Sequence, residues 1–252
     1  MNDNRRDFLK KISLAGAAAI TLPGILPAMA GDRPLDSPVS KTFLFQGDSI
    51  TDGGRSNNMD WNHLFGQDYA YLIASRLNYE YPDRDYKFFN RGISGNTVNN
   101  LAERWQQDAL DIKPDLLSIL VGINDVFAVV VKGEKITADD FGHTYDALLA
   151  KTISALPGVE LVICEPFILP VGMVKKNLTN WTTEVQKRQP IVKAIAVKYN
   201  AVYVPLQAAF DKATLKAPAE HWIWDGVHPM PAGHELIARE WLKTVNKRYK
   251  IL

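Results

Sequence analysis

Short apolar runs alternate with longer helical stretches from residue 41 onward, and this alternation most constrains the fold. Strands that alternate with helices imply a parallel sheet covered by helices on both faces. The expected strands are Phe43–Gln46, Tyr86–Asn90, Leu116–Val121, Val159–Cys164 and Ala201–Val204. The expected helices are Tyr69–Asn78, Asn96–Asp108, Phe141–Leu156, Glu184–Tyr199 with an interruption or bend near Pro190, and Pro231–Tyr249. Since no internal repeat is found, we expect a single domain over residues 41–252.

Four short polar blocks stand among these elements, and two of them directly follow strand-like runs. The blocks are Gly47–Ile50, Gly92–Asn96, Gly122–Asp125 and Asp225–Pro229. The first block follows Thr42-Phe43-Leu44-Phe45, and the third follows the run that ends at Val121. Open α/β sheets bind their ligands at the carboxyl ends of the strands. We therefore expect the four blocks to meet in one active site.

The residue types in these blocks suit the hydrolysis of an ester. Such a reaction needs a nucleophile, a base, a group that orients the base and donors for the oxyanion. Ser49 is the candidate nucleophile, although a serine after a strand also caps helices. His228 is the candidate base because an imidazole titrates near neutral pH. Asp225 precedes it by three residues, and Gly226 and Pro229 indicate a tight loop that folds the carboxylate against one ring nitrogen.

In order and setting, the blocks resemble those of the SGNH hydrolases, also called GDSL-type esterases and lipases. The resemblance spans roughly Lys41 to Lys247, and its one departure is Ile50, where the name-giving motif has leucine. It implies a three-layer α/β/α sandwich with a five-stranded, parallel, flavodoxin-like sheet. It also implies serine ester hydrolysis by a Ser-His-Asp mechanism with an acyl-enzyme intermediate and no cofactor.

The same resemblance implies three oxyanion donors: the backbone N–H groups of Ser49 and Gly95 and the side-chain amide of Asn124. A residue without a Cβ lets a substrate oxygen approach the backbone, and an amide donates without carrying a charge. Gly95 and Asn124 also suit ordinary turns. We expect Asp48 and Asp125, the acidic residues inside the blocks, to be structural and to accept from loop amides. Asp52, just after the first block, is expected to form a turn rather than to act as a second base.

The N-terminus has the pattern of an export signal. A twin arginine, Arg5-Arg6, precedes an apolar stretch from Ile12 to Leu26, and Ala28-Met29-Ala30 resembles a cleavage site. We expect residues 1–30 to be a cleavable twin-arginine-type signal peptide, residues 31–40 to be a short linker, and the mature protein to be periplasmic or secreted. The alternative is an uncleaved membrane anchor, but the stretch is shorter than the roughly 20 residues that a spanning helix needs.

Composition is ordinary for a soluble domain, with 46% hydrophobic and 23% charged residues. Removal of the leader changes the formal charge from +1 to about −1, which favours neither nucleic acid nor an anionic membrane as a partner. The single cysteine, Cys164, excludes an internal disulfide and reads as a buried strand residue. No histidine or cysteine cluster has the spacing of a metal site. The histidines outside the blocks are His63, His143, His221 and His234.

Tryptophans flank the candidate nucleophile and the candidate base. Trp61 lies in the loop after Ser49, and Trp222 and Trp224 precede Asp225. They suit stacking on sugar rings, and equally the packing of loops. A small exported enzyme with such aromatics favours removal of short acyl groups, above all acetyl, from carbohydrate. The alternatives are a lipid-directed esterase, either a lysophospholipase or a thioesterase, and a non-catalytic glycan-binding module. The last is disfavoured because no catalytic candidate has been lost.

Overall fold

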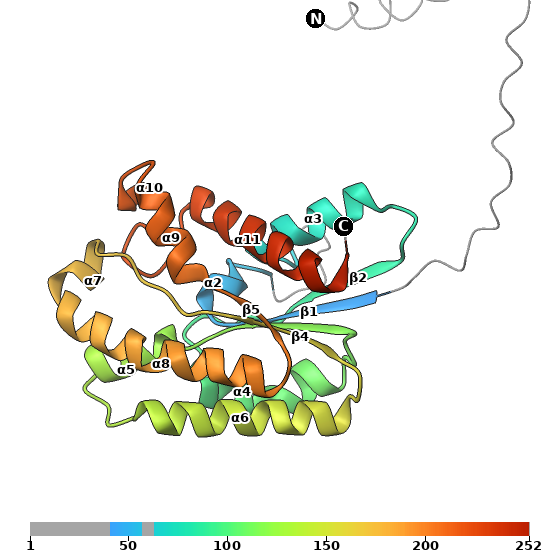
Figure 1. Ribbon diagram of the computed structural model, residues 1–252, viewed down its shortest axis with the longest axis horizontal. Coiled ribbons are helices and arrows are strands. Elements are labelled where there is room, and N and C mark those ends of the chain that lie inside the picture. The colour runs from blue at the N-terminus through green and yellow to red at the C-terminus, as the bar shows by residue number, and fades with distance from the viewer. Residues whose placement is uncertain (1–40, 57–62, 252) are drawn as a thin grey trace, which may run out of the picture. The chain divides into compact units, whose positions relative to one another are not determined.

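A five-stranded parallel sheet runs through the computed structural model, which describes residues 41–56 and 63–251 (Figure 1). The strands are β1 (Lys41–Gly47), β2 (Tyr86–Asn90), β3 (Leu116–Leu120), β4 (Glu160–Cys164) and β5 (Val202–Val204). Their order in the sheet is β2-β1-β3-β4-β5, and every pair is parallel. The predicted fold class is thus confirmed. The predicted signal peptide, the linker and Trp61 lie outside the described residues.

The centre of the sheet is built from strands buried on both faces. All five residues of β3 are buried, as are the last five of β1. In the register of this pair, Phe45 faces Ser118 and Gly47 faces Leu120, so the two strands end side by side. The chain leaves β1 toward β2 on one side and later returns to β3 on the other side. The carboxyl ends of β1 and β3 therefore form a topological switch point, where α/β sheets bind ligands.

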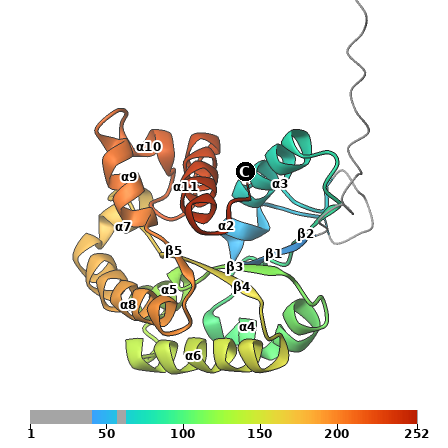
Figure 2. The same cartoon turned by 45° about the vertical axis from the view of Figure 1, so that its right-hand side comes forward.

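Helices cover both faces of the sheet (Figure 2). One face carries α3 (Tyr69–Glu80), α9 (Leu206–Thr214), α10 (Ala219–Trp222) and α11 (Pro231–Tyr249). The other face carries α4 (Val98–Trp105), α6 (Ala138–Ala155) and α8 (Leu178–Lys198). This arrangement gives the three layers that strand–helix alternation predicts.

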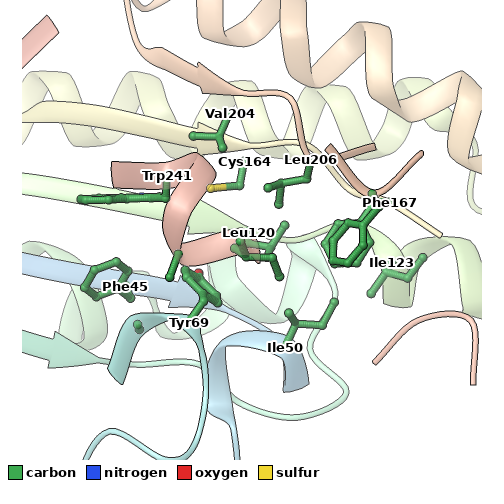
Figure 3. Packing of buried hydrophobic residues seen from close by; sticks show 14 of the residues in the cluster. Phe45, Ile50, Tyr69, Leu120, Ile123, Cys164, Phe167, Val204, Leu206 and Trp241 are labelled. Carbon is green, nitrogen blue, oxygen red and sulfur yellow. The ribbon is translucent and has the colours of Figure 1, made fainter. Parts of the chain in front are cut away.

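Large aromatic side chains fill the core on the α11 side (Figure 3). The ring of Phe45 packs against Tyr69 and Trp241, with ring centroids 6.0 and 5.7 Å apart. The Trp241 indole N–H donates to the Ser118 hydroxyl of β3 over 3.0 Å, so its polar atom is satisfied inside the core. Cys164 is buried at the end of β4, as its apolar run predicts.

Several boundaries differ from those expected. The predicted helix from Asn96 begins later, at Val98, because Thr97 and Asn100 form a capping box there. It also passes into a π-helical turn over Gln106–Leu110. Of the interruption or bend predicted near Pro190, the interruption is not found, since α8 continues through this exposed proline. Three short helices near the switch point have no counterpart in the predicted elements: α2 (Ser49–Asp52), α5 (Ile123–Val130) and α7 (Gly172–Lys176).

Candidate active site

Three predicted residues form one hydrogen-bonded chain at the switch point. The Oγ atom of Ser49 lies 2.8 Å from Nε2 of His228. The other ring nitrogen, Nδ1, lies 2.7 Å from Oδ2 of Asp225. The second carboxylate oxygen of Asp225 accepts from the backbone N–H groups of Val227 and His228 over 2.9 and 2.7 Å. Both oxygens are therefore engaged, and the carboxylate orients the ring with one nitrogen toward Ser49.

A tight loop holds the aspartate and histidine in this arrangement. Gly226 adopts a φ of +100°, and a Cβ atom there would lie 2.5 Å from the side chain of Val174. The segment around α7 closes over the loop, because the Leu169 N–H donates to the Gly226 carbonyl over 3.0 Å and the Met173 N–H to the Asp225 carbonyl over 2.9 Å. The close packing and the left-handed backbone both require glycine at position 226.

The electrostatics of this chain favour an ionised Asp225 beside the imidazole of His228. The hydrogen bond that the His228 ring donates to Asp225 is the largest influence on the pKa of His228 and holds it above the usual value, against the effect of burial. Burial acts to raise the pKa of Asp225, but the hydrogen bonds from His228 and Val227 outweigh it, and the pKa lies below the usual value. Asp225 thus stays ionised while the imidazole gains and loses a proton.

The three predicted oxyanion donors surround the same space. Ser49 begins α2 directly after β1, and the N-cap carboxylate of Asp48 accepts from the Ile50 N–H over 3.0 Å. Gly95 is exposed with a φ of +83°, and a Cβ there would meet open space. Asn124 lies in the first turn of α5, where its Nδ2 donates to the Asn96 carbonyl over 3.1 Å. That bond uses one amide hydrogen and leaves the second for a substrate oxygen.

The other acidic residues of the blocks bind loop amides. Asp48 caps α2, and burial raises its pKa to about 7. Asp125 accepts from the Val98 N–H at the start of α4, and burial raises its pKa to about 6. Asp52 accepts from both the N–H and the hydroxyl of Ser94, which lies beside Gly95. The structure thus gives Asp52 a contact with the second block, where the sequence suggested only a turn.

Of the two candidate substrate-binding tryptophans that the structure describes, Trp222 and Trp224, the second lies beside the triad. Its ring is 60% exposed and lies 6.2 Å from the His228 ring, with 26° between the ring planes. Trp222 packs against the core and lines a different hollow, between α9 and α11. Trp61 lies outside the described residues.

Sequence reasoning missed the apolar wall of the site. A cavity of about 370 Å³ opens at Ser49, His228, Gly95 and Asn124. Its other lining residues are Ser94, Ile123, Phe127, Met173, Trp181 and Val227. Trp181 is 1% exposed and its ring centroid lies 6.2 Å from that of Phe127. Phe127, Met173 and Trp181 stand on helices outside the four blocks, and no signal in the sequence connects them to Ser49.

Neither a metal centre nor a membrane span emerges from the described part of the chain. Residues 41–56 and 63–251 contain no group of three or more histidine, cysteine or acidic side chains that could hold a metal ion. Among the same residues, no helix combines the length and apolar character needed to cross a membrane.

Known proteins share this fold. Residues 45–236 match the GDSL-like lipase/acylhydrolase family. An acetylxylan esterase of Geobacillus stearothermophilus is 33% identical over 209 residues, which cover 81% of this chain and 93% of the relative. The crystal structure of Axe2, an acetylxylan esterase from that organism, matches with a TM-score of 0.72 at 30% identity, over 83% of this chain and 95% of the other.

A protein from Parabacteroides merdae described as a GDSL-like lipase matches with a TM-score of 0.79 at 37% identity, over 84% of this chain and 98% of the other. These likenesses extend across the whole sheet and its helices. The chain therefore belongs to the GDSL-like lipase/acylhydrolase family and is an esterase of the SGNH type.

Proposed function

We propose that this protein removes acetyl groups from carbohydrate by a serine esterase mechanism. The observation that carries the proposal is the Ser49–His228–Asp225 chain, with contacts of 2.8 and 2.7 Å, at the mouth of a small cavity of about 370 Å³. The chain supplies the nucleophile and its base, and the cavity sets the size of the acyl group.

In this mechanism, Ser49 Oγ attacks the ester carbonyl while Nε2 of His228 takes its proton. The N–H groups of Ser49 and Gly95 and the amide of Asn124 hold the oxyanion of the tetrahedral intermediate. The intermediate collapses to an acyl-enzyme, and His228 returns the proton to the leaving alcohol. Water then attacks the acyl-enzyme with the same assistance, and the acid leaves. Asp225 keeps the imidazole in the right tautomer and stabilises its positive charge throughout.

The apolar side of the cavity favours a short acyl group. Ile123, Phe127 and Met173 line it, and the buried indole of Trp181 forms part of its wall. Each extra methylene gains about 0.8 kcal/mol only where an apolar wall has room to bury it. Large rings bound this cavity, so we expect an acetyl methyl to gain from burial and a long chain to gain little more.

The alcohol side supports a sugar as the leaving group. The exposed ring of Trp224 lies roughly parallel to the ring of His228, the base that returns a proton to the leaving alcohol in this mechanism. An exposed indole beside a catalytic imidazole is a surface on which a sugar ring can stack. The acetylxylan esterase relative, 33% identical, acts by its name on an acetylated polysaccharide, and this supports the same substrate class here.

Two measurements test the proposal. With a series of p-nitrophenyl esters, we expect kcat/KM to be highest for acetyl and to fall steeply beyond butyryl. Acetylated xylo-oligosaccharides should release acetate, and Trp224→Ala should slow this release more than it slows hydrolysis of p-nitrophenyl acetate. Tyr79→Ala, which removes an exposed aromatic on α3, is the matched control and should change neither rate.

A kcat/KM that rises from acetyl to octanoyl would overturn the acetyl assignment and favour a lipid substrate. If Trp224→Ala slowed both reactions equally, the hypothesis that Trp224 binds a sugar on the leaving-group side would be contradicted.

A further inference from the structure

The backbone donor Gly95 has no side chain that could fix its own position. It lies in a loop that spans residues 91–96, and it is exposed. Glycine also has more backbone freedom than any other residue. Yet an oxyanion hole works only if its donors are already in place when charge develops. Contacts made by the neighbours of Gly95 must therefore fix the donor.

Asp52 makes such contacts with the residue directly before Gly95. One oxygen of its carboxylate, Oδ2, accepts from the Ser94 N–H over 3.0 Å and from the Ser94 hydroxyl over 2.6 Å. The latter distance is typical of a charge-assisted bond. The Asp52 side chain is 18% exposed, and its partner Ser94 is exposed.

Asp52 also belongs to the helix that carries the nucleophile. It is the last residue of α2, whose first residue is Ser49. One helical turn thus carries Ser49 at its start and, at its end, Asp52, which accepts the hydrogen bonds from Ser94. The donors on Ser49 and Gly95, which come from separate segments, are joined through this turn.

Two further contacts strengthen the junction between α2 and the loop. The Nε of Arg55, just after α2, donates to the Gly92 carbonyl over 2.8 Å and lies 3.9 Å from the other oxygen of Asp52. Gly92 packs directly on the helix end, because a Cβ there would lie 2.4 Å from the Asp52 nitrogen. The Asp52 carboxylate is therefore held from one side by Arg55 and binds Ser94 with the other.

We propose that Asp52 is a positioning residue of the oxyanion hole, which fixes the Gly95 N–H relative to the Ser49 N–H through its two bonds to Ser94. It does not touch the substrate. The inference rests on the proposed esterase mechanism, but it does not depend on which alcohol or which acyl group the natural substrate contains.

The proposal predicts which kinetic constant changes. A displaced donor weakens the transition state more than the ground state, so kcat should fall with little change in KM. We expect Asp52→Ala to lower kcat for p-nitrophenyl acetate by about 10- to 100-fold, less than the loss of a donor itself. Ser94→Ala, which removes only the hydroxyl bond, should have a smaller effect of the same kind.

The two substitutions should also be coupled. Because the Ser94 hydroxyl acts only through Asp52, the double variant Asp52→Ala/Ser94→Ala should be no slower than Asp52→Ala alone. Rates are normalised to active sites by the burst of p-nitrophenol, which excludes a simple loss of folded enzyme.

Affinity for a boronic acid gives a second readout, since its adduct with Ser49 places an oxygen in the oxyanion hole. Its inhibition constant should rise across the variants in proportion to the fall in kcat/KM. If Asp52 had only a structural role, the inhibition constant would not change in proportion to kcat/KM.

Asp146→Ala is the matched control. Asp146, on α6 at the far face of the sheet, likewise accepts several bonds, from Lys198 and Tyr199. Its loss should affect thermal stability but leave kcat per active site unchanged.

The proposal is overturned if Asp52→Ala retains kcat within twofold of wild type, if its loss is confined to KM, or if Asp146→Ala lowers kcat equally. If Asp52→Ala folds poorly, the test rests on Ser94→Ala. A Ser94→Ala variant with the kcat and boronate affinity of the wild type would contradict the proposal. All these effects are ratios of variant to wild type, measured on p-nitrophenyl acetate. If the wild type did not hydrolyse acetylated sugars, the proposed natural substrate would be wrong, but the role of Asp52 in the oxyanion hole would still be tested.

Discussion

Ser49 and His228 are separated by 179 positions in the sequence, and their Oγ and Nε2 atoms lie 2.8 Å apart. The contact joins the end of the first strand to the loop before the last helix, so it forms only when the whole sheet is assembled. A serine beside an imidazole that is itself held by a carboxylate is the arrangement that activates a hydroxyl nucleophile.

Replacement of Ser49 is therefore the most direct test of the mechanism. We expect Ser49→Ala to lose several orders of magnitude in kcat, because the members of a triad act as a unit. The fold should survive, since the side chain is not part of the core and Asp48 still caps α2. Circular dichroism and thermal melting check the fold, and a sulfonyl fluoride should label residue 49 of the wild type alone. Activity of the variant within about tenfold of wild type would exclude Ser49 as the nucleophile.

Asp225→Asn should change both the rate and its dependence on pH. The base must be neutral, so kcat/KM should rise with pH through the pKa of His228. The Asp225 hydrogen bond is the main cause that raises this pKa. Its loss should move the rising limb to lower pH, while kcat falls by roughly 10²–10⁴ because the imidazole loses its orientation. His234, whose pKa burial lowers to about 4, is neutral in this range. A fully active variant with an unmoved limb would mean that another group orients His228.

Asn124→Ala should lower kcat by roughly 10²–10³ with little change in KM, since an oxyanion donor acts mainly in the transition state. The side chain also donates to the Asn96 carbonyl, so thermal melting must accompany the kinetics. Asn99→Ala on α4, where the exposed amide bonds Thr144, serves as the control and should leave kcat unchanged. A raised KM with an untouched kcat would assign Asn124 to substrate binding instead.

The sequence was sufficient for the strands and for the blocks that follow them. Apolar runs such as Leu116–Val121 mark strands buried on both faces, and the sheet then places their polar ends together. Asp225 and His228 were also predictable as a pair, because only three positions separate them and Gly226 requires a tight loop.

The wall of the cavity was not predictable, because its residues meet only through packing. Trp181 lies on α8, far from every block, and Phe127 follows the third block on α5 but carries no group that suggests chemistry. A buried tryptophan looks the same in a sequence whether it fills a core or faces an active site. The contact of Asp52 with Ser94 was missed for a related reason, since an aspartate before Gly53-Gly54 also suits a simple turn.

Export remains a prediction that depends on the first residues of the chain. We expect Arg5-Arg6→Lys-Lys to retain precursor inside the cell, because the twin-arginine route reads that pair. Fractionation with an antibody against the protein measures the ratio of precursor to mature form. The doublet Lys10-Lys11→Arg-Arg keeps the charge and serves as the control. Undiminished export of the first variant would indicate the general secretory route.

Asp48 should make the stability of the fold depend on pH, and one substitution can test this. Burial raises its pKa in the folded protein from 3.8 to about 7. Between these values the folded state holds a proton that the unfolded state has lost, so the free energy of unfolding falls as pH rises through this window. Asn at position 48 still accepts from the Ile50 N–H as an N-cap but cannot ionise.

We therefore expect Asp48→Asn to gain stability relative to wild type as pH rises from 4 to 8, measured by urea unfolding at several pH values. Asp68 and Asp125, whose pKa values burial raises to about 8 and about 6, titrate in both proteins and leave the difference to Asp48. Asp139→Asn, at an exposed position of α6, is the control and should follow wild type. Parallel stability curves for wild type and Asp48→Asn would show that Asp48 is already ionised in the folded protein.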